Sequence, residues 1–133
     1  MKEFEFKVRV RYSETDQMGV VYHGNYAQYF EMGRVEWLRN IGLSYKWMEE
    51  NGVMLPVVSL NINYKKPARY DDLITVKTIF KSQTSVKIEF DYEIYNEEME
   101  LLTIANSILV FVDMKTGRPT APPEYIKQRL LLI

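Results

Sequence analysis

The sequence contains no cysteine and only one histidine among its 133 residues. The absence of cysteine excludes disulfide bonds, thiolate catalysis and cysteine-ligated zinc, and one histidine leaves little for a conventional metal site. The chain also has almost no net charge, because 17 basic and 18 acidic residues nearly cancel. There is therefore neither a basic field for nucleic acid nor a cationic face for a membrane surface. We expect no metal, no redox group and no nucleic-acid partner.

Long apolar runs are missing as well. No segment approaches the length of a membrane span, and residues 1–6 alternate charged with aromatic or apolar side chains instead of forming the apolar run of a signal peptide. We therefore expect a cytoplasmic protein without membrane insertion. With 47% hydrophobic residues and no linker, repeat or low-complexity tract, residues 1–133 are predicted to form one domain.

Period-two alternation of apolar and polar residues marks the predicted strands. The strands are expected at residues 4–12, 59–65, 73–81, 86–94 and 101–114. Breaks between them are predicted at 67–72 and 96–99, and Gly117 with Pro119 closes the last run. The run from 101 to 112 carries apolar residues on both faces, which predicts a central strand covered on both sides.

One long helix is predicted from residue 26, because aromatic and apolar residues recur there at i, i+3, i+4, i+7, i+11 and i+12 and the pattern ends at residues 40–42. Gly33 lies inside this stripe and costs about 1 kcal/mol of helix stability relative to alanine, so another element is expected to pack closely against it. Shorter helices are predicted at 44–51, with Ser44 as N-cap and Gly52 as the stop, and at 125–132, whose leucines suggest a subunit contact.

This order of elements predicts an α+β fold in which an antiparallel sheet of about five strands curves around one long central helix. Such a sheet leaves an edge exposed, and pairing of two copies would cover it. We therefore expect at least a homodimer.

The loop before the long helix carries the residues most suited to chemistry. Asp16 and His23, the only histidine, precede the helix, whose first N–H groups can polarise a carbonyl oxygen while Asp16 directs attack on the carbon. Each residue also has a purely structural interpretation. Asp16 can shape a turn before Gly19, His23 can be satisfied near the helix cap, and Asn25 is expected to cap the helix through its side-chain oxygen.

Residues 16–26, Asp-Gln-Met-Gly-Val-Val-Tyr-His-Gly-Asn-Tyr, closely resemble the signature of the 4-hydroxybenzoyl-CoA thioesterase-like acyl-CoA thioesterases. Further similarity lies in residues 64–72, so the resemblance spans nearly the whole chain. It is greatest to the small bacterial members often associated with Tol–Pal genes of the cell envelope. The resemblance implies a hotdog fold and tetramers of paired dimers with active sites at subunit interfaces.

The resemblance also implies roles for individual residues. Asp16 would attack the thioester carbonyl or activate a water, and the His23 backbone N–H would bind the carbonyl oxygen. Gly24 would let the substrate approach the backbone. Tyr22 is a candidate for the acyl pocket or the core, and Asn25, Ser59 and Asn61 are candidates for polar contacts with the substrate. The candidates for binding the phosphates of coenzyme A are the basic residues Lys65, Lys66, Arg69 and Arg118.

Another branch of hotdog thioesterases carries its catalytic carboxylate on the long helix, where this chain has Glu31 and Glu36. Both are predicted to be solvated or paired surface groups. A hotdog dehydratase is disfavoured, because its histidine signatures are missing.

The predicted function is hydrolysis of short- to medium-chain or aromatic acyl-CoA, with coenzyme A as part of the substrate and no separate cofactor. The carrier remains open, because an acyl carrier protein thioester suits the same chemistry. The alternative is a non-catalytic protein of the same fold that binds acyl thioesters or envelope partners.

Overall fold

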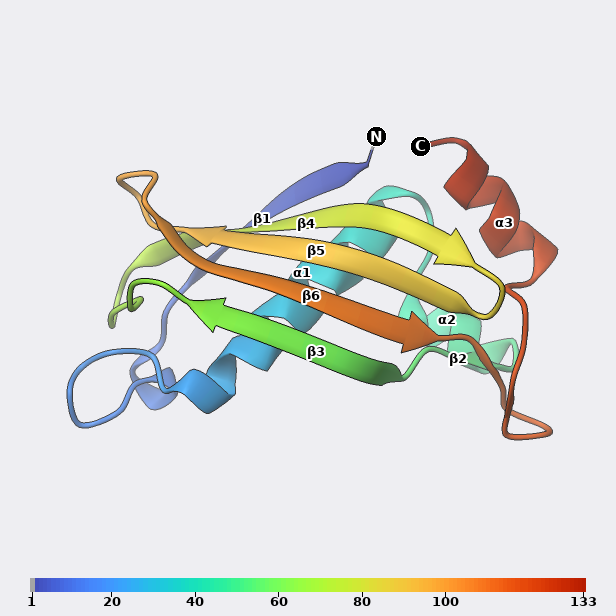
Figure 1. Cartoon of the computed structure of the whole chain (residues 1–133), viewed down its shortest axis with the longest axis horizontal. Coiled ribbons are helices and arrows are strands. Elements are labelled where there is room, and N and C mark those ends of the chain that lie inside the picture. The colour runs from blue at the N-terminus through green and yellow to red at the C-terminus, as the bar shows by residue number, and fades with distance from the viewer. Residues whose placement is uncertain (1) are drawn as a thin grey trace.

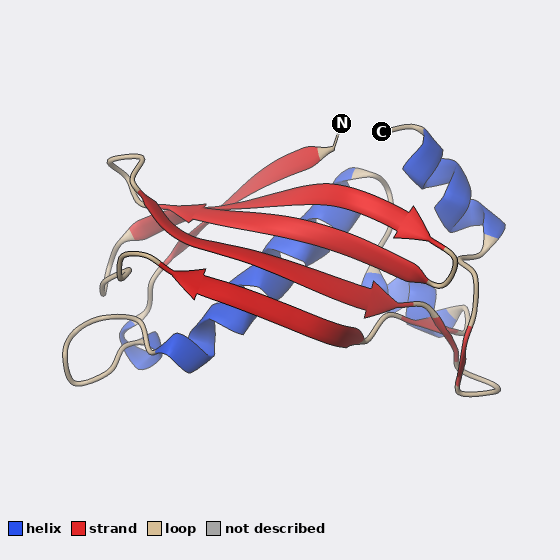
Figure 2. Ribbon diagram, viewed as in Figure 1, coloured by secondary structure: helices blue, strands red, loops and turns tan. Residues whose placement is uncertain are grey.

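The computed structural model describes residues 2–133 and shows a five-stranded antiparallel sheet with one long helix lying across it (Figure 1). The sheet order is β1 (Glu3–Arg9), β4 (Leu73–Thr84), β5 (Lys87–Tyr95), β6 (Leu101–Val110) and β3 (Val57–Tyr64). The helix, α1 (Tyr26–Asn40), covers one face, and Figure 2 shows the other face of the sheet turned toward the viewer with no helix over it. This is the sheet and helix arrangement that the sequence predicts.

Smaller elements extend one end of the sheet. A second sheet has the order β2 (Val53–Met54), β7 (Val112–Asp113) and β8 (Arg118–Pro119). Two short helices, α2 (Tyr45–Glu50) and α3 (Glu124–Leu131), match the predicted positions within one residue at each end. The Ser44 side chain accepts the Trp47 N–H at 3.0 Å, so the predicted N-cap is confirmed.

The core lies between α1 and the sheet. The predicted apolar stripe of the helix is confirmed, since Tyr29, Phe30 and Trp37 are all at most 1% exposed. The Trp37 ring stacks on Phe80 with centroids 5.6 Å apart and meets Phe90 edge-on at 5.0 Å. These contacts fix the helix to the middle of the sheet.

The close packing predicted at Gly33 is also confirmed. A Cβ atom at this position would lie 2.7 Å from Thr78 Oγ1 and 2.8 Å from Val76 Cγ1, which is closer than side-chain carbons approach in folded proteins. Only glycine lets the helix come this near to β4, and the gain in packing offsets its low helix propensity.

Two strand predictions need correction. The first strand ends at Arg9 instead of Tyr12, because the chain turns there into a 3-10 helix, η1 (Tyr12–Glu14). The run from 101 to 114 is not one strand, because β6 ends at Val110 and β7 joins the second sheet.

β6 is central in the sheet, as predicted, but its second face is not fully covered. Ile104, Asn106 and Ile108 remain half-exposed within residues 2–133.

Among the helices of the described residues, none has the length and apolar character of a membrane span.

Candidate active site

Asp16 lies in a tight turn between η1 and α1. The Gly19 N–H donates to the Asp16 carbonyl oxygen at 3.1 Å, and the positive φ of Gly19, 78°, completes the turn. One carboxylate oxygen of Asp16 accepts the Met18 N–H at 2.8 Å. The other oxygen accepts no hydrogen bond from residues 2–133, and the side chain is half-buried. Asp16 therefore shapes the loop with one oxygen and leaves the second open.

The long helix begins at Tyr26, as the sequence pattern predicts, and a short 3-10 helix precedes it. A 3-10 turn, η2 (His23–Asn25), runs directly into α1, so the N–H groups of Asn25 and Tyr26 donate to the carbonyls of Tyr22 and His23. Within the described chain, the N–H groups of His23 and Gly24 donate to no protein atom. Two successive peptide donors are therefore unused at the positive end of the helix dipole.

A cavity of about 300 Å³ joins the carboxylate to the helix start. Its lining comes from the loop, the first turn of α1 and the segment after β3, namely Asp16, Met18, Val20, Val21, His23, Tyr26, Tyr64, Lys65, Lys66 and Pro67. The Tyr64 hydroxyl donates to the His23 carbonyl at 3.0 Å, and its ring meets the Tyr26 ring edge-on at 5.1 Å. The cavity thus combines one acid, two lysines and an apolar wall.

Comparison with known proteins identifies the family. The profile of the Thioesterase-like superfamily matches residues 10–130. The chain belongs to this superfamily. It is 42% identical over 113 residues to the putative acyl-CoA thioesterase YneP of Bacillus subtilis, covering 85% of this chain and 82% of that protein. It is 35% identical over 123 residues to the acyl-CoA thioester hydrolase YbgC of Escherichia coli, covering 92% of each.

A solved structure of a thioesterase supports this family assignment. The DHNA-CoA thioesterase of Staphylococcus aureus superposes with a TM-score of 0.90 at 38% identity, covering 96% of this chain and 86% of that one. The hotdog fold predicted from the sequence is therefore confirmed, and the prediction of a thioester hydrolase is confirmed at the level of the superfamily.

The structure brings together four of the predicted site residues, because Asp16, His23, Lys65 and Lys66 all line the cavity. The His23 imidazole makes no hydrogen bond to Asp16 or to any other described residue. It packs against the Tyr22 ring, with centroids 4.4 Å apart and the ring planes tilted by 45°. A Cβ atom at Gly24 would lie 2.7 Å from Cε2 of the same ring, so a larger residue there would displace the exposed Tyr22 side chain. Lys66 pairs with Glu100 at 2.6 Å, whereas Lys65 has no acidic partner within residues 2–133.

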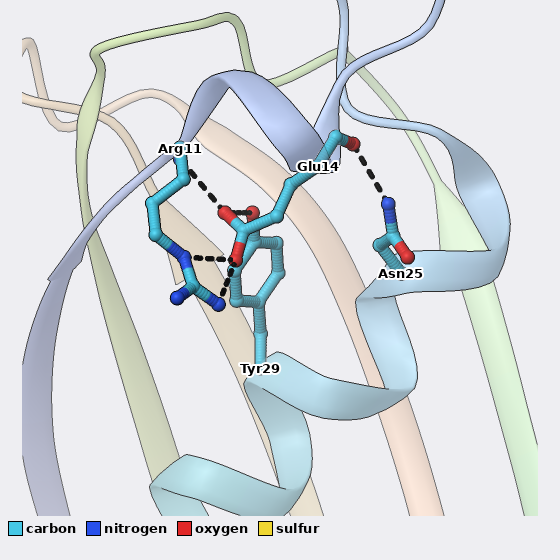
Figure 3. Close-up of polar contacts among 4 residues, drawn as sticks. All are labelled: Arg11, Glu14, Asn25 and Tyr29. Carbon is cyan, nitrogen blue, oxygen red and sulfur yellow. Dashed lines mark hydrogen bonds and ion pairs between the residues drawn. The ribbon is translucent and has the colours of Figure 1, made fainter.

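Asn25 does not cap the helix through its side-chain oxygen, so that prediction is wrong. The residue sits inside the 3-10 turn with helical φ and ψ of −88° and −11°, where an N-cap needs an extended backbone. Its side-chain N–H instead donates to the Glu14 carbonyl at 2.8 Å (Figure 3). Asn25 thus ties the helix start to the loop that carries Asp16.

Several other predicted residues lie away from the cavity. Ser59 and Asn61 alternate with Leu60 and Ile62 on β3, so the two pairs lie on opposite faces of the sheet. Asn61 borders a separate hollow on the uncovered face. Arg118 lies in the small sheet at the opposite end of the molecule from the Asp16 loop (Figure 1).

Arg69 contributes its backbone to the loop, which it contacts in a bridge with Val20, but its exposed side chain does not line the cavity. On α1, Glu31 is exposed and Glu36 pairs with Arg39, which confirms that both are surface groups.

Several residues of the site region received no site role from the sequence, including Tyr26, Tyr64 and Glu14. Tyr26 and Tyr64 line the cavity, and Glu14 is buried beside it with 4% exposure. The signal for Tyr64 was its position at the end of a strand directly before Lys65. Glu14 gave no such signal, because a charged residue in a loop ordinarily lies in solvent.

Glu14 makes stability depend on pH in the acid range. Burial raises the pKa of its carboxyl, but hydrogen bonds from the Arg11 N–H, the Tyr29 hydroxyl and the Arg11 side chain, with the charge of Arg11, outweigh burial and hold the pKa below its ordinary value of 4.5. A lowered pKa in the folded state stabilises the protein above pH 4.5 and loses that contribution as the pH falls through the folded value. We expect the free energy of unfolding to decline below about pH 4.5.

Urea denaturation between pH 7 and pH 3 measures this effect. Glu14→Gln should be less stable at pH 7, and the gap to the wild type should narrow as the pH falls, because the wild type alone loses the carboxylate. The other acids titrate in both proteins, so they cancel in the difference. Two stability curves that stay parallel down to pH 3 would contradict the assignment.

Proposed function

We propose that this chain hydrolyses acyl-CoA thioesters to a free acid and coenzyme A, with Asp16 as nucleophile or general base. The observation that carries the proposal is the single cavity bordered by the open oxygen of Asp16 and by His23, whose N–H is unused. A thioester carbonyl placed there has a carboxylate for its carbon and peptide donors for its oxygen.

The reaction needs little more than these groups. In the general-base route, Asp16 takes a proton from water as the hydroxyl adds to the carbonyl carbon, and the N–H groups of His23 and Gly24 stabilise the oxyanion. The C–S bond then breaks, and the thiolate takes up the proton. In the nucleophilic route, Asp16 itself displaces the thiolate and water hydrolyses the anhydride. A thiolate is a good leaving group, so one carboxylate suffices.

The remaining lining suits the two ends of the substrate. Lys65 and Lys66 stand at the cavity as partners for the phosphates of coenzyme A, with Lys65 free of any described acidic partner. Tyr26 and Tyr64 present aromatic surface to the acyl group. Aromatic acyl groups belong among the substrates to be tested, because a relative with 38% identity is named a DHNA-CoA thioesterase.

Release of free thiol from a panel of butyryl-, octanoyl- and benzoyl-CoA, together with an acyl carrier protein thioester, tests this proposal. Steady turnover of one of them supports hydrolysis and identifies the carrier and acyl class. The alternative function, a non-catalytic acyl-thioester binder, gives binding in calorimetry without thiol release from any of the four.

We also propose that the working form is a homodimer paired through β3. This strand is one of the two edges of the main sheet, and it exposes apolar side chains, including Val57 at 44% and Val58 at 58%. Such an edge in a single chain is open to pairing with a second copy. The half-exposed Ile104 and Ile108 of β6 leave further surface for association of dimers.

Light scattering coupled to size exclusion measures the assembly directly. The wild type should have at least twice the mass of one chain, and Val58→Lys should reduce the mass, because it places a charge on the paired edge. The circular dichroism spectrum should stay unchanged. A monomeric wild type at micromolar concentration would contradict the proposal.

A further inference from the structure

Glu14 is a buried carboxylate two positions before Asp16, and the reaction described above does not use it. Its side chain is 5% exposed and lies under the Arg11 side chain, which is 70% exposed. One carboxylate oxygen accepts the Arg11 N–H and the Tyr29 hydroxyl, each at 2.8 Å. The other accepts Arg11 Nε and lies 3.0 Å from Arg11 Nη2 (Figure 3). The carboxylate therefore joins the end of β1 to the helix α1.

The backbone of the same residue joins the two arms of the loop. The Glu14 carbonyl accepts the Tyr22 N–H at 3.0 Å and the Asn25 side-chain N–H at 2.8 Å. Tyr22 and Asn25 flank His23 and Gly24, whose N–H groups are unused. On the other arm, Thr15 bridges Val21 and the Asp16 N–H donates to the Val20 carbonyl at 2.9 Å. Hydrogen bonds thus connect Glu14 and its neighbours both to the loop segment that carries Asp16 and to the helix start with its unused N–H donors.

Stability alone does not account for this arrangement. The Arg11 side of the ion pair is 70% exposed, and ion pairs open to solvent contribute little to stability. A fully satisfied polar network does, however, fix one geometry. Burial and Glu14 raise the pKa of Tyr29, so its hydroxyl stays protonated and donates to Glu14.

We infer that Glu14, through Tyr29, is a positioning residue that sets the distance between the Asp16 carboxylate and the N–H groups of His23 and Gly24. The inference rests on the proposed hydrolysis and goes beyond it, because Glu14 touches neither substrate nor reacting atoms. If the loop shifts relative to the helix, the Asp16 carboxylate and the N–H groups no longer reach the carbon and the oxygen of the same carbonyl group. Misplacement on the ångström scale is sufficient to reduce a rate on the order of 100-fold.

The test compares Tyr29→Phe and Glu14→Gln with the wild type in acyl-CoA hydrolysis. Each variant should lower kcat by about 10- to 100-fold and change KM little, because the binding surface is retained while the reacting groups are misaligned. The double variant should lose little more than the worse single variant, since both changes break one connection. Tyr29→Phe keeps the test valid if Glu14→Gln folds poorly.

Tyr92→Phe is the matched control. It also removes a buried tyrosine hydroxyl, which accepts Arg34 Nη1 at 3.0 Å and bonds Ser107 Oγ at 2.7 Å, but it leaves the loop untouched. Its melting temperature should fall as in Tyr29→Phe, while its kcat stays at the wild-type value. An unchanged kcat in Tyr29→Phe and Glu14→Gln, or an equal loss in Tyr92→Phe, overturns the positioning role.

Asp16→Asn, assayed in parallel, separates this inference from the proposed function. If Asp16→Asn is inactive while the Glu14 and Tyr29 variants keep their kcat, only the positioning role fails. If Asp16→Asn retains full activity, the proposed mechanism fails, and the positioning role fails with it.

Discussion

Replacing Asp16 by asparagine should lower kcat/KM for acyl-CoA hydrolysis by about 10²- to 10⁴-fold, the usual contribution of a positioned general base. Asparagine keeps a side-chain oxygen that can accept the Met18 N–H, so the turn is preserved and only the reactive oxygen is lost. The melting temperature should therefore change little. Thiol release under saturating and limiting substrate measures kcat and KM separately.

Glu31→Gln is the matched control for this variant. It removes the same charge from an exposed position on α1, the element that carries the carboxylate in the other branch of hotdog thioesterases. Its activity should equal that of the wild type. If Asp16→Asn keeps its activity and Glu31→Gln loses it, the catalytic carboxylate lies on the helix and not in the loop.

The two routes open to Asp16 differ in the fate of the water oxygen. In a single turnover in ¹⁸O-labelled water, a nucleophilic Asp16 can acquire the label when the anhydride is hydrolysed at the aspartyl carbonyl. If Asp16 acts as a general base, the labelled oxygen of the water enters only the product acid. Mass spectrometry of the peptide that contains Asp16 distinguishes the two.

Replacing Trp37 by alanine should lower the free energy of unfolding by about 3–5 kcal/mol, as large-to-small changes of buried aromatic residues do. The ring is 1% exposed and packs on Phe80 and Phe90, and its N–H donates to the Lys2 carbonyl at 3.0 Å. The variant therefore loses packing on both sides of the indole and a hydrogen bond to the chain start. Urea denaturation followed by circular dichroism measures the loss.

Trp47→Ala serves as the comparison, because it removes the same side chain from a site that is 46% exposed. Its one aromatic partner is Tyr125, at 4.7 Å, so the expected loss is about 1 kcal/mol. Equal losses in the two variants would show that α1 is not fixed to the sheet through Trp37.

Patterns along the chain predicted what local periodicity controls. The stripe of α1, the close approach at Gly33 and the alternation of β3 to β5 all follow from which faces are apolar. The same alternation places Ser59 and Asn61 on the face opposite Leu60 and Ile62, so strand parity explains why these two polar residues do not line the cavity.

Other features depend on contacts between distant segments, which periodicity does not encode. The burial of Glu14 requires Tyr29, fifteen residues away, and Arg11 together. Asn25 does not cap α1 because it belongs to the preceding 3-10 helix, which gives it a helical backbone conformation. Arg118 lies away from the cavity because it belongs to the second sheet, which the sequence pattern did not predict.

The hydrogen bond from the Met18 N–H to Asp16 has a consequence for the role that we propose for this side chain. A free aspartate side chain rotates about two bonds and loses that freedom when it reaches a transition state. Here one oxygen is already held by the turn, so the torsion angles are set before substrate arrives and the second oxygen points in a fixed direction. In the proposed reaction, the turn therefore fixes the torsion angles of the Asp16 side chain, and the backbone sets the direction of attack.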